Sequence, residues 1–170
     1  MKYARIALVF LLISSAFAQR ASFPSGEERV FSPDKKLWIR DSGGILTLET
    51  DHKKHRVLRY SRTVDVLWAP GSDYLAVNDW ATSNTAEPLL ISVANPDKPV
   101  NLYEKLRAEL DKDGQAELLK NNDHVYFVAV RWVGPKTVLL NLFGHGDPKA
   151  PRGFSRFYRY TVGTGFSRQK

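Results

Sequence analysis

Cysteine is absent from the 170 residues of this sequence. The chain therefore has no disulfide framework, no thiol nucleophile and no cysteine that could carry a lipid. Its stability must come from ordinary burial of apolar side chains, and 43% of the residues are apolar. This composition is typical of a globular protein and excludes collagen-like, low-complexity and disordered chains.

Long apolar runs are absent as well. The run Ile6–Ile13 is far shorter than the roughly 20 residues that a membrane-spanning helix needs. Basic residues precede it and small residues follow it, which is the pattern of a secretory signal peptide over 1–18, cleaved after Ala18. We expect a single β domain over 19–170, periplasmic or secreted, with no transmembrane segment in the mature chain.

Helical periodicity is nearly missing after the leader. Short β-branched and aromatic runs separated by Gly, Pro, Asn and Asp predict strands instead, and many of them alternate, which indicates sheets with one buried face. The predicted strands are Arg29–Ser32, Leu37–Asp41, Ile45–Thr50, Arg56–Tyr60, Val64–Trp68, Tyr74–Asn78, Leu89–Val93, Val100–Tyr103, Val125–Trp132, Thr137–Phe143 and Arg156–Val162.

One segment predicts a helix. Leu102, Leu106 and Leu110 recur at the spacing of one helix face, and Asn101 with Glu104 resembles a capping box. We expect a helical insertion over 102–123 between strands, with a second short helix near Ala116–Leu119.

A strand–turn–strand unit recurs three times along the chain. The copies are Val30–Asp34 followed by Leu37–Ile39, Leu67–Gly71 followed by Leu75–Val77, and Arg131–Pro135 followed by Val138–Leu140. Each has an aromatic residue at a strand end, a turn containing proline with Gly or Asp, and a returning apolar strand. These copies resemble the WD40-like β-propeller repeat of the TolB type, although the third copy has Gly134-Pro135 in place of Pro-Asp.

The resemblance implies an all-β fold of about three propeller-like, four-stranded antiparallel blades over 28–61, 64–103 and 125–170. Closed propellers have typically 4–8 blades. One hypothesis is therefore that two chains associate to close a ring, which makes the protein a homo-oligomer. A β-sandwich or an open β-meander is the alternative fold.

Acidic residues are absent after Asp147, where basic and aromatic residues interleave. Arginine beside aromatic rings favours an anionic partner, although an edge strand guarded by arginine has the same pattern. In propellers of this type the long connections Asp79–Pro88 and Gly144–Gly153 share a face with the insertion, and long loops on rigid scaffolds often bind ligands. The predicted binding residues are Asp79, Trp80, His145, Asp147, Arg152, Arg156, Tyr158, Arg159 and Tyr160.

Catalytic motifs are also missing: the sequence has no Gly-x-Ser-x-Gly elbow, no P-loop and no dinucleotide fingerprint. We therefore predict no catalytic residue, no metal and no cofactor. The predicted function is an exported, non-enzymatic binding protein that recognises a protein or an anionic envelope component, and export disfavours nucleic acid. The alternatives are a hydrolase or lyase that uses the 144–147 loop, and a structural or accessory subunit.

Overall fold

The computed structural model describes residues 20–24, 29–112, 117–120, 122–146, 149 and 152–169. The predicted signal peptide and the predicted binding residue Asp147 lie outside these residues. The strands are β1 (Arg20–Phe23), β2 (Arg29–Phe31), β3 (Trp38–Asp41), β4 (Ile45–Glu49), β5 (Lys54–Arg59), β6 (Thr63–Trp68), β7 (Tyr74–Trp80), β8 (Thr85–Ser92), β9 (Asn95–Asn101), β10 (His124–Trp132), β11 (Thr137–His145), β12 (Phe154–Thr161) and β13 (Gly165–Arg168). The helices are α1 (Leu102–Lys112) and α2 (Glu117–Lys120).

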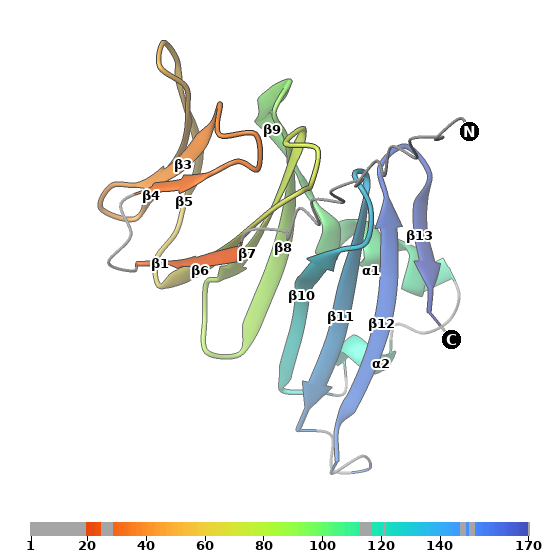
Figure 1. The fold of residues 1–170 in the computed structure, drawn as a ribbon. Helices are drawn as coiled ribbons and strands as arrows, with labels where there is room; N and C mark the ends of the chain where they lie inside the picture. The colour runs from red at the N-terminus through yellow and green to blue at the C-terminus, as the bar shows by residue number, and fades with distance from the viewer. Residues whose placement is uncertain are drawn as a thin grey trace, which may run out of the picture.

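The strands follow one another as three antiparallel meanders, which confirms the all-β class (Figure 1). The first meander is β2-β3-β4-β5 and forms a four-stranded sheet of its own. The second runs through β6, β7, β8 and β9, and the third through β10, β11, β12 and β13. Because each turn joins neighbouring strands, this order needs only the local turn signals of the sequence.

The expectation of three separate blades is corrected by the way the second and third meanders join. Thr85 and Ala86 of β8 pair in parallel with Val125 and Tyr126 of β10. Together with β1, this pairing merges the two meanders into one nine-stranded sheet. The described strands therefore form two sheets and do not close into a propeller ring.

Several strands differ from the sequence-based expectation, and β8, β9 and β1 illustrate the causes. β8 begins at Thr85 and runs through Pro88, whereas the predicted strand began after that proline. β9 contains Pro96 and Pro99, which an edge strand tolerates because one side of its backbone makes no ladder bonds. β1 was not predicted, and it pairs antiparallel with β6, which is distant in the sequence.

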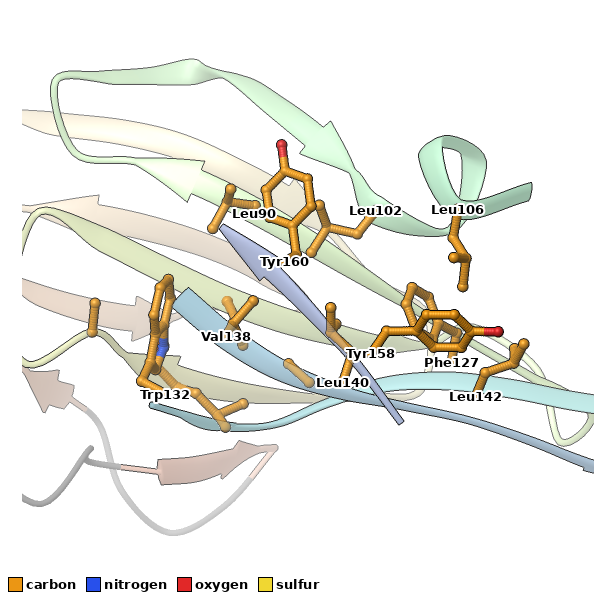
Figure 2. Close-up of a cluster of buried hydrophobic side chains, with 14 of the residues drawn as sticks. Leu90, Leu102, Leu106, Phe127, Trp132, Val138, Leu140, Leu142, Tyr158 and Tyr160 are labelled. Carbon is orange, nitrogen blue, oxygen red and sulfur yellow. The ribbon is translucent and has the colours of Figure 1, made fainter. Parts of the chain in front are cut away.

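Helix α1 forms as its spacing and cap predict. The Asn101 side-chain oxygen accepts hydrogen bonds from the backbone N–H groups of Tyr103 at 2.9 Å and Glu104 at 3.1 Å. Leu102, Leu106 and Leu110 are all buried. Figure 2 shows Leu106 pointing from the helix toward the aromatic side chains of the sheet. The helix therefore covers one face of the nine-stranded sheet.

The second meander separates two hydrophobic cores. Its Val66 and Ile91 pack with first-meander residues such as Ile39. Its Leu67 and Leu90, on the opposite face, pack with the third meander and α1. Leu90 is labelled in Figure 2. The three meanders are thus layered in chain order, with the second in the middle.

Indole hydrogen bonds connect each meander to the one before it. Trp68 of the second meander donates to the backbone carbonyl of Val30 in the first at 3.3 Å. Trp132 of the third donates to the backbone carbonyl of Leu67 in the second at 3.0 Å. Val30 directly precedes the strand-end aromatic of the first copy, and Leu67 directly precedes that of the second. The two indole hydrogen bonds therefore end at corresponding positions of the repeated unit.

The turns of the first two copies also correspond. Ser32 N–H donates to the Leu37 carbonyl at 2.8 Å, and Ala69 N–H donates to the Tyr74 carbonyl at 2.9 Å. The fourth residue of each turn has positive φ, 61° at Lys35 and 63° at Ser72. The third copy closes one residue earlier, from Val133 N–H to the Thr137 carbonyl at 2.9 Å. This shorter turn is where the sequence has Gly-Pro in place of Pro-Asp.

Candidate functional site

The third meander has one face turned away from the core. Side chains alternate along β10, β11 and β12, so Phe127, Leu140 and Tyr158 are buried against the second meander and α1. The opposite side, which we call the outer face, consists of Tyr126, Val128, Leu139, Asn141, Phe143, Phe157 and Arg159. Phe157 is 41% exposed. Both helices lie behind the sheet as seen in Figure 1, on the side opposite the outer face.

The series of meanders explains why no further layer of the described residues covers this face. Val30 and Leu67 occupy the position that faces the following meander, and each is 1% exposed. The third copy has Arg131 at that position, and its side chain is exposed. A charged guanidinium there disfavours burial under another apolar layer. The outer face is therefore the end of the layered stack.

The other end of the stack is closed by its own polar network. Glu49 of the first meander accepts hydrogen bonds from Trp38 Nε1 at 3.0 Å and Thr47 Oγ1 at 2.8 Å, and Lys54 Nζ lies 3.0 Å away. Burial raises the pKa of Glu49, but the Thr47, Lys54 and Trp38 contacts outweigh it and hold the pKa below its usual value. Arg29 lies over the Trp38 ring at 5.4 Å. This satisfied polar surface resembles a capping layer, unlike the outer face.

Charge distinguishes the third meander from the rest of the chain. From His124 onward the sequence has one acidic residue, Asp147. The basic residues of the same segment are Arg131, Lys136, Lys149, Arg152, Arg156, Arg159, Arg168 and Lys170. Arg131 and Arg159 are exposed, and Arg159 stands on the outer face. The apolar centre of this face is therefore accompanied by positive charge.

Two of the predicted binding residues meet at one corner of the outer face. Trp80 of β7 lies 5.9 Å from Tyr126, and His145 of β11 lies 6.3 Å from it, between ring centroids. Tyr126 donates its hydroxyl proton to the Ser83 carbonyl at 2.6 Å. His145 also stacks on His124 at 4.4 Å. Tyr126 thus connects the start of one long connection with the end of β11.

Asp79 occupies a different environment from its neighbour Trp80. It stands opposite Glu87 in the β7–β8 register, and its Oδ1 atom is buried without a hydrogen-bond partner among the described residues. Burial, and then the negative charge of Glu87, raise the pKa of Asp79. The Trp80 indole instead donates to Asp65 at 3.0 Å.

The remaining predicted residues divide between core and surface. Tyr158 is 4% and Tyr160 8% exposed, and both rings contact Phe166 within the core, so they support the sheet and offer no surface. Arg152 is exposed in the turn before β12, and Arg156 is half-buried in β12, opposite the buried Leu142 of β11. The two predicted tyrosines therefore lie on the buried side of β12, whereas Arg159 lies on its outer side.

Sequence reasoning missed the apolar part of the outer face. Tyr126, Val128, Leu139, Phe143 and Phe157 belong to strands that it did predict. The sequence does contain a signal for this face. An ordinary half-exposed strand alternates apolar and polar residues, whereas both sides of β10 and β11 are apolar.

The chain matches no family model, and no curated protein is found to be similar to it. Within the described ranges, no helix has the length and hydropathy needed to cross a membrane. Among the same residues, no three histidine or carboxylate side chains gather as a metal-binding group.

Proposed function

We propose that this protein is an exported, non-enzymatic binding protein that recognises an acidic partner protein through the outer face of its third meander. One observation carries the proposal: an apolar sheet face with exposed Phe157 and Arg159 ends a stack whose other end is closed by polar contacts. Aromatic and arginine side chains are enriched in protein interfaces and at their hot spots. Export rests on the leader-like sequence at the N-terminus.

The proposal includes the origin of the three meanders. We interpret them as divergent copies of a WD40-like, TolB-type unit, layered as an open stack. The corresponding indole bonds of Trp68 and Trp132 support this interpretation, as do the matched turns at Ser32 and Ala69.

A protein partner fits the outer face better than a polyanion does. Val128 and Phe143 present half-buried hydrocarbon at its centre, which a phosphate backbone would not cover. An acidic protein surface with an apolar centre would bury this hydrocarbon and pair its carboxylates with Arg131 and Arg159. The hydrolase or lyase alternative has no supporting arrangement among the described residues, where His145 stacks on a second histidine.

Site-specific photo-crosslinking tests the proposal. A benzophenone amino acid is placed at Phe157 in cells that export the full chain, and at Phe31 in a matched control. Phe31 is an aromatic of nearly equal exposure, 39%, at the opposite end of the stack. We expect one discrete adduct from position 157, its loss on Arg159→Glu, and none from position 31. Equal adducts from both positions, or none from 157, would contradict the proposal.

A further inference from the structure

The last strand of the nine-stranded sheet covers only part of its neighbour. β13 pairs with residues 158–161 of β12, and no described strand lies beside residues 154–156 on the side away from β11 (Figure 1). A cavity of about 410 Å³ opens at this step in the sheet, and it is lined by Leu139, Ser155, Arg156, Phe157, Arg168 and Gln169. We call residues 154–157 of β12 the open edge.

The backbone of the open edge directs hydrogen-bonding groups away from the sheet. Phe157 accepts a hydrogen bond at its carbonyl from the N–H of Gln169 at 3.0 Å, on the side where β13 lies. Alternate residues of an antiparallel strand direct their N–H and C=O groups to the same side. Ser155 therefore directs both groups to the side where no described strand pairs with it. Groups of this kind are a template for the addition of another strand.

Two other strand edges are protected in a way that the open edge is not. β9 contains Pro96 and Pro99, and β2 has only three residues. β12 and β13 contain no proline, and β12 has eight residues. The protection that they have is charge, since Arg156 is half-buried in β12 and points toward the core side of the sheet. An inward-pointing charge disfavours any added strand that does not neutralise it.

The core side of the open edge therefore selects for an acidic residue. Arg156 pairs with the buried Leu142, and Arg168 pairs with the buried Tyr158, so both arginines lie on the side opposite the outer face. A strand that continued the line of β13 would place one residue across from Arg156, on the same side as Arg168. A carboxylate at that position would pair with the guanidinium groups. Arg156 also has an interaction within the chain, and a guanidinium with five donors serves more than one acceptor.

The outer side of the open edge selects for an apolar residue. The next residue of the added strand would stand across from Ser155, and its side chain would lie on the outer side. Phe157 is a diagonal neighbour of that position and is 41% exposed. An apolar side chain there would remove hydrocarbon from water. The two sides together fit a strand in which an acidic residue precedes an apolar one.

We propose that the open edge binds an extended acidic segment of the partner protein, which adds to the sheet as a strand antiparallel to β12. A second copy of this chain does not fit, because its own open edge would bring arginines against Arg156 and Arg168. The inference rests on the proposed function, since Phe157 belongs to both the open edge and the outer face. It adds the conformation and the residue pattern that the partner must present.

Titration of the full chain with short peptides tests strand addition. The probe is acetyl-Glu-Val-Thr-Val-Thr-amide, and its charge control has Lys in place of Glu. We expect saturable amide NMR shifts at 154–157 and 168–169, slower hydrogen exchange at the Ser155 amide, and binding of the Lys peptide that is about tenfold weaker or more.

Methylation of single peptide amides separates strand addition from attraction by charge alone. A methyl group on the first Val amide blocks the hydrogen bond to Ser155 and should abolish binding. A methyl group on the Thr amide that follows points away from β12 and is the matched control, which should retain binding.

A charge reversal and a matched control assign the effect to the open edge. Arg168→Glu, at an exposed strand end, should weaken binding of the Glu peptide about tenfold, which corresponds to about 1.4 kcal/mol, and should strengthen binding of the Lys peptide. Lys136→Glu makes the same change of charge in the exposed turn between β10 and β11, beyond the other end of β12, and should bind both peptides as the parent does.

Four results would overturn strand addition: no saturable shifts, equal binding of the two methylated peptides, unchanged affinities in Arg168→Glu, or protection of the Ser155 amide that rises with protein concentration without peptide. The last result would assign the open edge to a second copy of the chain. Crosslinking from position 157 does not depend on these peptides. An adduct without peptide binding therefore rejects strand addition alone, whereas peptide binding without an adduct rejects the proposed function.

Discussion

At the scale of single residues, the third meander differs from the other two at one corresponding position. This difference disfavours the addition of a further layer to the stack. Val30 and Leu67 are buried under the next meander, whereas Arg131 is exposed. Removing a guanidinium from water without a partner carries a large desolvation penalty. The same residue that ends the stack therefore adds positive charge to the proposed binding surface.

Asp79 provides a prediction at this scale. Its raised pKa means that the fold disfavours the charged form, so stability is lost as pH rises through the folded-state pKa. Asp79→Asn removes this loss and should raise the melting temperature at pH 7. The gain should shrink toward zero as pH falls below about 4, where the unfolded aspartate also becomes protonated.

Melting curves from pH 3.5 to 8 measure the effect, with Asp51→Asn as an exposed control that should show no such pH dependence. A lower melting temperature for Asp79→Asn at pH 7 would contradict the raised pKa of Asp79.

At the scale of elements, one buried side chain connects β7 and β10, two strands that do not pair with each other through their backbones. Asn78 of β7 is fully buried. Its side-chain amide makes two hydrogen bonds with the backbone of Ala129 in β10, as a neighbouring strand would. Its Nδ2 donates to the Ala129 carbonyl at 3.0 Å, and its Oδ1 accepts from the Ala129 N–H at 2.7 Å. The second and third meanders therefore connect through this amide as well as through the β8–β10 pairing.

Asn78→Ala should destabilise the protein by about 2–4 kcal/mol, because it leaves a buried N–H and a buried carbonyl unpaired. Urea unfolding measures the difference. Asn95→Ala, at an exposed position of β9, is the matched control and should stay within about 0.5 kcal/mol of the parent. A loss for Asn78→Ala no larger than that of the control would show that the amide is not needed.

At the scale of the whole molecule, both ends of the stack disfavour a ring of two chains. The first meander is closed by the contacts of Glu49, and Arg131 stands where another layer would need an apolar residue. Two outer faces brought together would also oppose arginines of like charge. The polar surface around Glu49 is of the kind that terminal repeats of layered proteins use to stay soluble.

Light scattering should therefore show a monomer at micromolar concentration in physiological salt. Arg131→Leu restores the residue type of the other copies and should increase self-association, whereas Arg40→Leu, on the first meander, should do so less. A stable dimer of the parent chain would support the ring hypothesis and contradict the monomer.

Local patterns predicted much of the fold because their causes lie within a few residues. The cap at Asn101 and the leucines of α1 interact across single helical turns, and proline and glycine mark most of the tight turns. The same locality explains the failures, since β1 pairs with a strand about forty residues away and β9 tolerates its prolines as an edge strand.

The candidate site likewise combines features that the sequence predicted with features that only tertiary packing decided. Sequence patterns predicted the basic third meander, its arginines, Trp80 and His145 as candidates, since composition and loop length are read directly from the chain. Tertiary packing decided which side of β12 is buried, and it left the outer face without a further layer of described residues. Alternation divides a strand into two faces, but only contact with α1 and the second meander determines which face is removed from water.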